Sequence, residues 1–241
     1  FHKRNLVLLS IMQIYYKIKK FLKIPIPLFL KKLLKKYYGK NNLDKKLEKF
    51  LNYKNGFYIE IGAYDGVTQS NTLYFEKNKN WRGILIEPSK EIFEKCKKHR
   101  SKKNYFYNKA CVSFNYKKKF LKLNYSGLKT YSDKYLDVKK QKEYISNPEI
   151  FIGEKTYEYR AKTATMNSLL FKSNAPKIID FLSLDTEGAE FEVLGGIDFQ
   201  KFKFRYLLIE TDNILKLKKF IFKKKYKYIK KLNENDYLFK N

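Results

Sequence analysis

The sequence predicts an α/β fold with a mostly parallel sheet, and three observations support this prediction. Short apolar segments alternate with helical segments, which is typical of parallel strands joined by right-handed crossovers. Several apolar segments end in an acidic residue and lead into a glycine-containing or helix-forming turn. The last two apolar segments are separated by a short polar turn, which indicates an antiparallel hairpin at the end of the sheet.

The individual elements follow from apolar runs and their boundary signals. Ser70 or Asn71 is a suitable N-cap for the first helix of the main domain, and Gly195-Gly196 ends a later one. The predicted strands are 57–61, 83–87, 105–112, 178–184 and 205–210, followed by the hairpin strands 226–232 and 237–240. The predicted helices are 70–79, 88–100, 164–171, 186–194 and 214–225.

The chain divides into a basic amphipathic N-terminal extension, 1–50, and a main domain, 51–241. In the extension, lysine clusters alternate with apolar residues, and Pro25 and Pro27 separate two short helices. Such helices suit the surface of an anionic membrane; the alternative is that they pack on the main domain with lysines outward. The apolar stretch near the start is too short to span a bilayer, which needs roughly 20 apolar residues.

An insertion over about 113–163 interrupts the alternation of strands and helices. It is polar and rich in lysine and tyrosine, with turn signals along its length. A connection of this length inside a compact domain is usually functional or mobile. We expect it to cover the site or bind a substrate, and the alternative is a disordered lysine-rich loop.

The composition restricts partners and location. The formal net charge is +29, but only five of the 53 basic residues are arginine. Nucleic-acid readers rely on arginine for bidentate contacts, so the charge indicates a solvated surface rather than a nucleic-acid interface. The two cysteines, Cys96 and Cys111, have no metal-binding spacing. We expect them to be buried thiols in a cytoplasmic protein, which is peripheral on the inner membrane face if the extension binds there.

The turn from Gly62 to Gly66 predicts a nucleotide cofactor without a phosphate at that position. Glycines there allow the backbone to approach a ligand. Tyr64 occupies the place of the second glycine of a dinucleotide-binding motif, and Glu60 before the turn repels phosphate. S-adenosylmethionine, with a sulfonium, an ammonium and a carboxylate, satisfies these conditions. Glu87, at the end of the next strand, is placed to bind ribose hydroxyls.

These arguments give a set of expected cofactor-binding residues: Glu60, Gly62, Ala63, Tyr64, Asp65, Gly66, Asn71, Glu87, Pro88, Asn108, Ala110 and Asp185. Each has a structural alternative. The glycines could serve only a tight turn, the Asp65 side chain could only form that turn, and Glu87 could cap the following helix.

Four segments of the main domain resemble the FkbM-type methyltransferase family: Gly62-Ala-Tyr-Asp-Gly66, Ser70-Asn-Thr72, Trp81-Arg-Gly-Ile-Leu-Ile-Glu-Pro88 and Asp185-Thr-Glu-Gly-Ala-Glu190. The resemblance covers roughly residues 52–239. It implies a Rossmann-like class I methyltransferase fold with a seven-stranded sheet, S-adenosylmethionine as donor, and O-methylation. Family members act on sugars, glycolipids and polyketides. Where they commonly have Thr-Leu-Asp-Asp-Leu-Leu, this chain has Thr165-Met-Asn-Ser-Leu-Leu170.

The expected catalytic residues are Asp185, Glu187 and Glu190, at the carboxyl edge of the sheet. Glu187 and Glu190 are three residues apart on the first turn of the predicted helix, so they share a face. This pair suits a general base or a metal cluster. The alternative is that they only stabilise the helix dipole. Both histidines lie away from the strand ends, so a carboxylate or a divalent metal must assist removal of an acceptor proton. The candidate metal ligands are Asp185, Asp212 and Asn213.

The sequence therefore predicts an S-adenosylmethionine-dependent O-methyltransferase acting on a sugar hydroxyl of a glycan or glycolipid. Its expected partners are that glycan or lipid-linked sugar and an anionic membrane surface bound through residues 1–40. One alternative is an RNA methyltransferase that uses the basic surface, although the fourth strand lacks the Asn/Asp-Pro-Pro motif that holds a flipped base. Another is a membrane-associated, non-catalytic module of the same fold.

Overall fold

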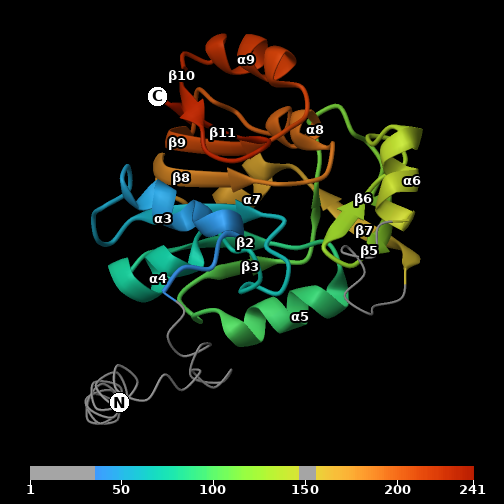
Figure 1. Ribbon diagram of the computed structural model, residues 1–241, viewed down its shortest axis with the longest axis horizontal. Helices are drawn as coiled ribbons and strands as arrows, with labels where there is room; N and C mark the ends of the chain where they lie inside the picture. Colours follow the sequence, from blue (N-terminus) through green and yellow to red (C-terminus); the bar gives the residue numbers. More distant parts are fainter. Residues whose placement is uncertain (1–35, 147–155) are drawn as a thin grey trace, which may run out of the picture. The chain divides into compact units, whose positions relative to one another are not determined.

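The computed structural model describes residues 36–146 and 156–241 (Figure 1). Apart from Lys36, these residues belong to one compact unit, Tyr37–Asn241. The membrane-binding helices predicted for the extension lie outside the described residues, except for residues 36–40. In the part of the chain that is described, no helix combines the length and the apolar character needed to cross a membrane.

A mixed seven-stranded sheet with strand order β10-β11-β9-β8-β1-β2-β3 forms the centre of this unit. Strands β3, β2, β1, β8 and β9 are parallel to one another, and β11 pairs antiparallel with both β9 and β10. The α/β class and the C-terminal hairpin are therefore confirmed. The strands are β1 (Phe57–Ile61), β2 (Arg82–Ile86), β3 (Tyr105–Tyr107), β8 (Ile178–Leu184), β9 (Lys203–Glu210), β10 (Lys227–Lys231) and β11 (Asp236–Lys240).

Helices cover both faces of the sheet because the strand side chains alternate between two cores. Phe57, Ile59 and Ile61 of β1 pack in a core with residues of α7, α8 and α9, whereas Tyr58 packs in a second core with α3, α4 and α5. The helices are α3 (Leu43–Glu48), α4 (Leu73–Lys79), α5 (Lys90–His99), α7 (Met166–Lys172), α8 (Glu190–Leu194) and α9 (Ile214–Phe222), with a short 3-10 helix, η1, at Lys40–Asn42.

The helix α3 packs as part of the compact unit, although the sequence pattern places its residues in the extension. Leu43 and Leu47, one helical turn apart, and the following Leu51 are all buried in the second core. A helix with apolar residues at this spacing buries one face. Cys96 and Cys111 are buried free thiols, as predicted.

The insertion folds into a second sheet of order β4-β7-β5-β6, although the sequence pattern predicts no strand within 113–163. Leu121 and Leu123 of β5 are buried while Lys122 between them is exposed, so the alternation expected of a strand is present among the lysines. The elements are β4 (Ala110–Cys111), β5 (Phe120–Ser126), β6 (Lys129–Tyr131), α6 (Val138–Ser146) and β7 (Tyr157–Ala164).

The predicted third strand, 105–112, is divided between the two sheets. Its first part is β3, which pairs with β2, and its last part is β4, which pairs with β7. At the division, Asn108 Nδ2 donates hydrogen bonds to the backbone oxygens of Glu87 (2.9 Å) and Pro88 (2.8 Å). The side chain of Asn108 thus fixes the point where the chain leaves the main sheet for the insertion.

The helix after β8 begins at Glu190, not at Thr186 as predicted. Glu187 and Gly188 have left-handed backbone conformations, with φ of 49° and 95°, so a right-handed helix cannot include them. Glu187 and Glu190 therefore do not share a first helical turn, which corrects that part of the prediction. Glu187 instead lies in the turn between β8 and α8.

Candidate active site

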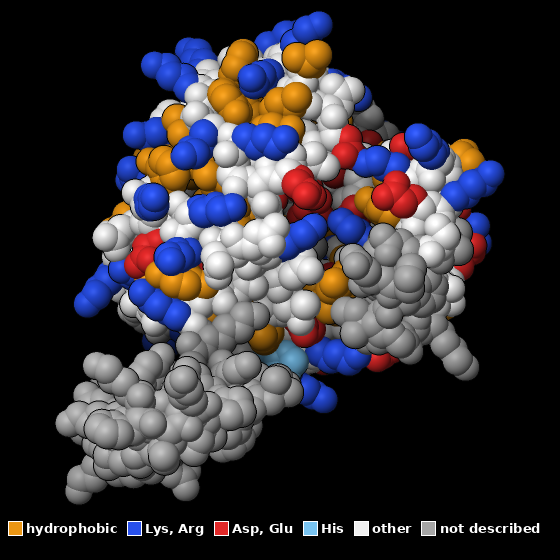
Figure 2. Space-filling model, viewed as in Figure 1, with side chains coloured by type: hydrophobic (Ala, Val, Ile, Leu, Met, Phe, Trp, Pro, Cys, Tyr) orange, Lys and Arg blue, Asp and Glu red, His pale blue; other side chains and the backbone are white. Residues whose placement is uncertain are grey.

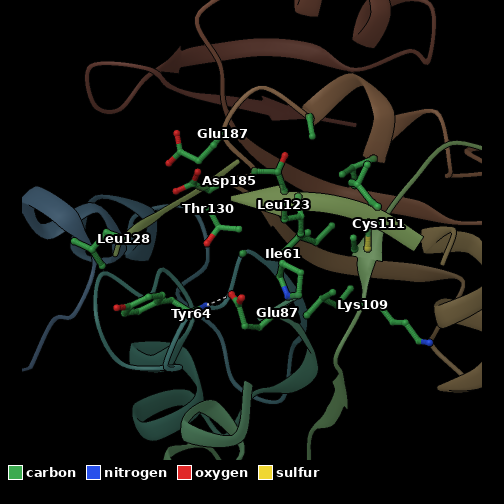
Figure 3. Close-up of a pocket in the computed structure, with 18 residues that line it drawn as sticks. Ile61, Tyr64, Glu87, Lys109, Cys111, Leu123, Leu128, Thr130, Asp185 and Glu187 are labelled. Carbon is green, nitrogen blue, oxygen red and sulfur yellow. Dashed lines mark hydrogen bonds between the residues drawn. The ribbon is translucent and has the colours of Figure 1, made fainter. Parts of the chain in front are cut away.

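A pocket lies at the carboxyl ends of β1, β2 and β8, the edge at which open α/β sheets bind ligands (Figure 3). Its walls include six of the residues predicted to bind the cofactor: Gly62, Tyr64, Glu87, Pro88, Ala110 and Asp185. The insertion contributes Leu121, Leu123, Leu128 and Thr130 to the same walls. We call this cavity the donor pocket. The insertion therefore covers a pocket of the main sheet.

Glu87 is a buried carboxylic acid on the wall of the donor pocket. Its Oε2 accepts a hydrogen bond from the backbone N–H of Tyr64 (3.0 Å; Figure 3), and its Oε1 accepts one from that of Ser89 (2.8 Å). Burial raises the pKa of Glu87 to about 7, and the two backbone N–H groups oppose the rise. Each carboxylate oxygen can accept a further hydrogen bond, which suits a ligand with hydroxyl groups.

The raised pKa of Glu87 predicts a pH-dependent free energy of unfolding. The folded protein holds this proton more tightly than the unfolded chain, in which the carboxyl has a pKa of 4.5. Stability should therefore decrease as pH rises from about 4.5 to 7, with up to about 3 kcal/mol due to Glu87. Glu87→Gln should remove this contribution. Urea unfolding at pH 5 and pH 8 measures it.

The control for this measurement is Glu91→Gln, because the Glu91 side chain is 69% exposed on α5. It should keep the pH dependence of the wild type. If the unfolding free energy of Glu87→Gln depends on pH as in the wild type, Glu87 is not the acid that causes this dependence.

Gly62 and Gly66 are required by packing within the protein. Both have φ of +78°. A Cβ on Gly62 would lie 2.1 Å from the backbone oxygen of Asp185, and one on Gly66 would lie 2.7 Å from Cγ of Arg100. The sequence motif predicts that these glycines allow close approach of a ligand. The structure adds that they let the end of β1 approach the end of β8 and let the turn pack on Arg100, at the end of α5.

Glu60 does not line the donor pocket, in contrast to its predicted role as a cofactor ligand. Its carboxylate accepts hydrogen bonds from the Asn71 backbone N–H (2.8 Å) and the Thr72 hydroxyl (2.7 Å). It also pairs with Nη1 of Arg100 at 3.1 Å, and both side chains are buried. Glu60 thus stabilises the protein behind the Gly62–Gly66 turn.

Five other predicted cofactor residues also lie outside the pocket lining: Ala63, Asp65, Gly66, Asn71 and Asn108. Oδ1 of Asp65 accepts hydrogen bonds from the backbone N–H groups of Val67 (2.8 Å) and Thr68 (2.7 Å), which is the turn-forming alternative. Asn71 Nδ2 donates to the Ser183 hydroxyl (3.1 Å). These side chains support the turn and the strand ends that carry the pocket.

Three acidic side chains meet at one end of the donor pocket. Asp185 follows β8, Glu187 lies in the next turn and Glu210 ends β9, and one carboxylate oxygen of each lies within 4.8 Å of the others. Burial raises the pKa of Asp185 well above its ordinary value, Glu210 and Glu187 raise it further, and Lys129 opposes them. Burial likewise raises the pKa of Glu187, although Lys129 lowers it. We call these three residues the acidic cluster.

The acidic cluster also borders a second, more polar cleft. Asp185 and Glu187 line both cavities, whereas Glu190 and Glu210 line only the second, which we call the polar cleft. Figure 2 shows a group of acidic side chains near the middle and right of this face, with basic side chains among them and over the rest of it. The three predicted catalytic residues therefore border one cleft, and two of them also reach the donor pocket.

Glu190 has a supporting contact in this arrangement. Its Oε1 accepts a hydrogen bond from the backbone N–H of Gly188 (2.8 Å), which fixes the left-handed turn that carries Glu187. Burial raises the pKa of Glu190 to about 7.

Two of the three predicted metal ligands, Asp212 and Asn213, have partners within the protein. Asp212 forms an ion pair with Lys140, and Oδ1 of Asn213 accepts from the backbone N–H of Lys216 (3.0 Å) at the start of α9. Among the described residues, the acids with metal-like spacing are instead those of the acidic cluster. The ammonium of Lys129 forms an ion pair with Glu187 in this cluster.

Sequence reasoning missed Glu210, Lys129 and the apolar wall from the insertion. A signal existed for Glu210, because it ends a predicted strand at the same edge as Asp185. Lys129 had no such signal in a chain with 53 basic residues. Predicting the apolar wall requires recognising strand β5 within a lysine-rich segment.

A pocket at the carboxyl edge of a mixed seven-stranded sheet, with acids at its strand ends, defines a methyltransferase-like α/β domain. The Methyltransferase FkbM domain matches residues 60–238. Since this match covers most of the sequence, the chain belongs to the FkbM methyltransferase family, and the resemblance noted in the sequence is confirmed.

A solved structure of a methyltransferase FkbM from Methylobacillus flagellatus KT is similar to this chain, with 12% sequence identity and a TM-score of 0.45. The similarity covers 78% of this chain and 44% of that chain, so this chain spans less than half the length of its solved relative. No curated protein matches the sequence.

Proposed function

We propose that this protein is an S-adenosylmethionine-dependent O-methyltransferase that acts on a sugar hydroxyl of a glycan or glycolipid. The observation that carries the proposal is the geometry of the donor pocket. The buried carboxyl of Glu87 lies on its wall, and Asp185 and Glu187 of the acidic cluster lie at one end of it.

The residues of the donor pocket fit S-adenosylmethionine. Glu87 has free acceptor capacity for the two ribose hydroxyls, and Ala110, Leu121 and Leu123 offer an apolar wall for adenine. The buried Thr186 hydroxyl, also on the wall, has no hydrogen-bond partner among the described residues, so it is available to a polar ligand. When bound, S-adenosylmethionine supplies an electrophilic methyl group.

Asp185 is the best-placed general base for an acceptor hydroxyl. It borders both the donor pocket and the polar cleft, so a group in the cleft can meet one in the pocket beside it. Its raised pKa makes its ionised form a stronger base than an ordinary aspartate. We propose that Asp185 removes the acceptor proton, rather than that a bound metal activates the hydroxyl. Lys129 already supplies a positive charge at the acidic cluster.

The polar cleft favours a hydroxylated acceptor without phosphate. Seven acidic residues, among them Glu187, Glu190 and Glu210, line it against three lysines, in a chain whose formal net charge is +29. Carboxylates accept hydrogen bonds from hydroxyl groups but repel phosphates. This argues for a sugar and against the RNA alternative.

The donor proposal predicts binding of S-adenosylmethionine that depends on Glu87. In calorimetry, Glu87→Ala should weaken binding by at least about tenfold, because a hydrogen bond to a charged group contributes about 1.5–3 kcal/mol. Glu91→Ala, on the exposed side of α5, is the matched control and should bind like the wild type. Absence of binding to the wild type would reject the enzyme proposal in favour of a non-catalytic module.

We also propose that the extension, residues 1–40, brings the enzyme to an anionic membrane. Its support is the sequence pattern of lysine clusters and apolar residues. Sedimentation with phosphatidylglycerol vesicles should recover more of the full chain than of a chain beginning at Tyr37. Equal recovery of the two would contradict this proposal.

A further inference from the structure

The tip of the β5–β6 hairpin reaches both cavities of the candidate site. Leu128 and Thr130 line the donor pocket, and Lys129 between them lines the polar cleft, which Leu128 also borders. Leu128 is in the turn, whereas Lys129 and Thr130 are neighbouring residues of β6. Neighbouring residues of a strand point to opposite sides, so the start of β6 can contribute to two cavities at once. The insertion is therefore linked to the donor side and the acceptor side through consecutive residues.

The ammonium of Lys129 lies among groups from several elements of the fold. It forms an ion pair with Glu187, lies 3.8 Å from Oε1 of Glu210 and lies 5.5 Å from the ring centroid of Tyr144 in α6. The Tyr144 hydroxyl in turn donates to Oε2 of Glu187 at 2.5 Å. The Lys129 side chain is only 22% exposed and that of Glu187 only 9%.

Two further acids act on Lys129, and two other lysines, Lys40 and Lys140, line the same cleft. Asp185 at the end of β8 and Asp236 in β11 both interact electrostatically with it. Burial lowers the pKa of Lys129, but Glu187, Asp185 and Glu210 together raise it above its ordinary value. Lys129 is therefore a cation over the whole physiological range.

We propose that Lys129 is a positioning residue, whose ammonium holds the insertion over the donor pocket and supplies the positive charge that keeps the acidic cluster together. Three partly buried carboxylates within 4.8 Å repel one another strongly. A cation among them offsets that repulsion and leaves Asp185 able to exchange a proton. The structural part of this inference stands on the ion pairs alone, and its catalytic meaning rests on the proposed methyl transfer.

The first test uses the full chain and requires no acceptor. Lys129→Ala removes a propylammonium group, so its melting temperature should fall by about 5–10 °C. Adding n-propylammonium chloride should recover at least half of this loss, relative to the same concentration of sodium chloride. Lys129→Arg should melt close to the wild type because it restores a cation.

The matched control is Lys140→Ala. Lys140 also lies in the insertion and pairs with Asp212, but outside the acidic cluster, and the Asp212 side chain is 53% exposed. Its melting temperature should fall less and should not respond specifically to n-propylammonium. The inference is overturned if Lys129→Ala melts like Lys140→Ala, or if n-propylammonium acts no better than sodium on Lys129→Ala.

The second test separates positioning from stability alone. With an acceptor in hand, Lys129→Ala should lower kcat by at least about tenfold and change KM for S-adenosylmethionine by less than about threefold. Lys129→Arg should keep most of the wild-type activity because it restores the cation. An unchanged kcat would overturn the catalytic part. Failure of the wild type to transfer methyl groups would instead count against the proposed function, and the melting results would still judge the ion pairs.

Discussion

Asp185→Asn is expected to reduce methyl transfer by at least about 100-fold while S-adenosylmethionine still binds. Asparagine keeps the shape of the side chain but cannot accept the acceptor proton, and a positioned general base contributes about 10²–10⁴-fold. Asp185 and Glu187 both border the donor pocket and the polar cleft, but Asp185 directly follows β8. Transfer of a radiolabelled methyl group to a panel of alkyl glycosides measures the rate.

The control for Asp185→Asn is Asp133→Asn, in the insertion, whose side chain is 49% exposed. It should transfer methyl groups at the wild-type rate. The wild-type rate should also rise with pH on the acid side, because only the ionised form of Asp185 accepts a proton, and Asp185→Asn should lose that rise. Full activity of Asp185→Asn would show that the acidic cluster is structural.

Arg100→Met is expected to lower the free energy of unfolding by about 3–5 kcal/mol, the largest stability effect predicted here. Arg100 has no exposed side-chain surface and pairs with Glu60 at 3.1 Å and with Glu76 at 2.9 Å. It also donates to the Gly66 backbone oxygen (3.1 Å) and the Tyr58 hydroxyl (2.8 Å). Removing the guanidinium leaves two largely buried carboxylates without their cation. Urea unfolding at pH 7 measures the loss.

A matched control for Arg100→Met is Arg205→Met. Arg205 pairs with Asp180 at 3.2 Å, but its side chain is 59% exposed. Its loss should cost less than about 1 kcal/mol, as for other surface ion pairs. Because Gly66 packs on Arg100, Arg100→Met should also weaken S-adenosylmethionine binding. Equal stability of the two variants would contradict a structural role for the buried network.

Glu60 and Glu87 show how far a sequence motif can locate a site. Both are acids at or near the end of adjacent strands, and both were assigned to the cofactor. Only Glu87 lines the donor pocket, because Glu60 lies before the end of β1 and its carboxylate is held by Arg100 and the residues before α4. The spacing of the motif does not indicate that Glu60 pairs with Arg100, because Arg100 is 40 residues away from Glu60 in the sequence.

The α/β class, the order of the main-sheet strands along the chain and the position of Asp185 at a strand end could be read from the amino-acid sequence. These features depend on local apolar patterning and turn residues, which a single chain displays directly. The family resemblance rested on short segments of the same local kind.

The assembly of the acidic cluster and its contact with Lys129 required the tertiary structure. Glu187 and Glu210 come from different elements, and Lys129 reaches them only because β5 pairs with β6 and β7 in a second sheet. A lysine-rich segment gives no local sign of which lysine will be buried beside acids. Long-range pairing decides that, because the energy of an ion pair depends on distance and burial rather than on position in the sequence.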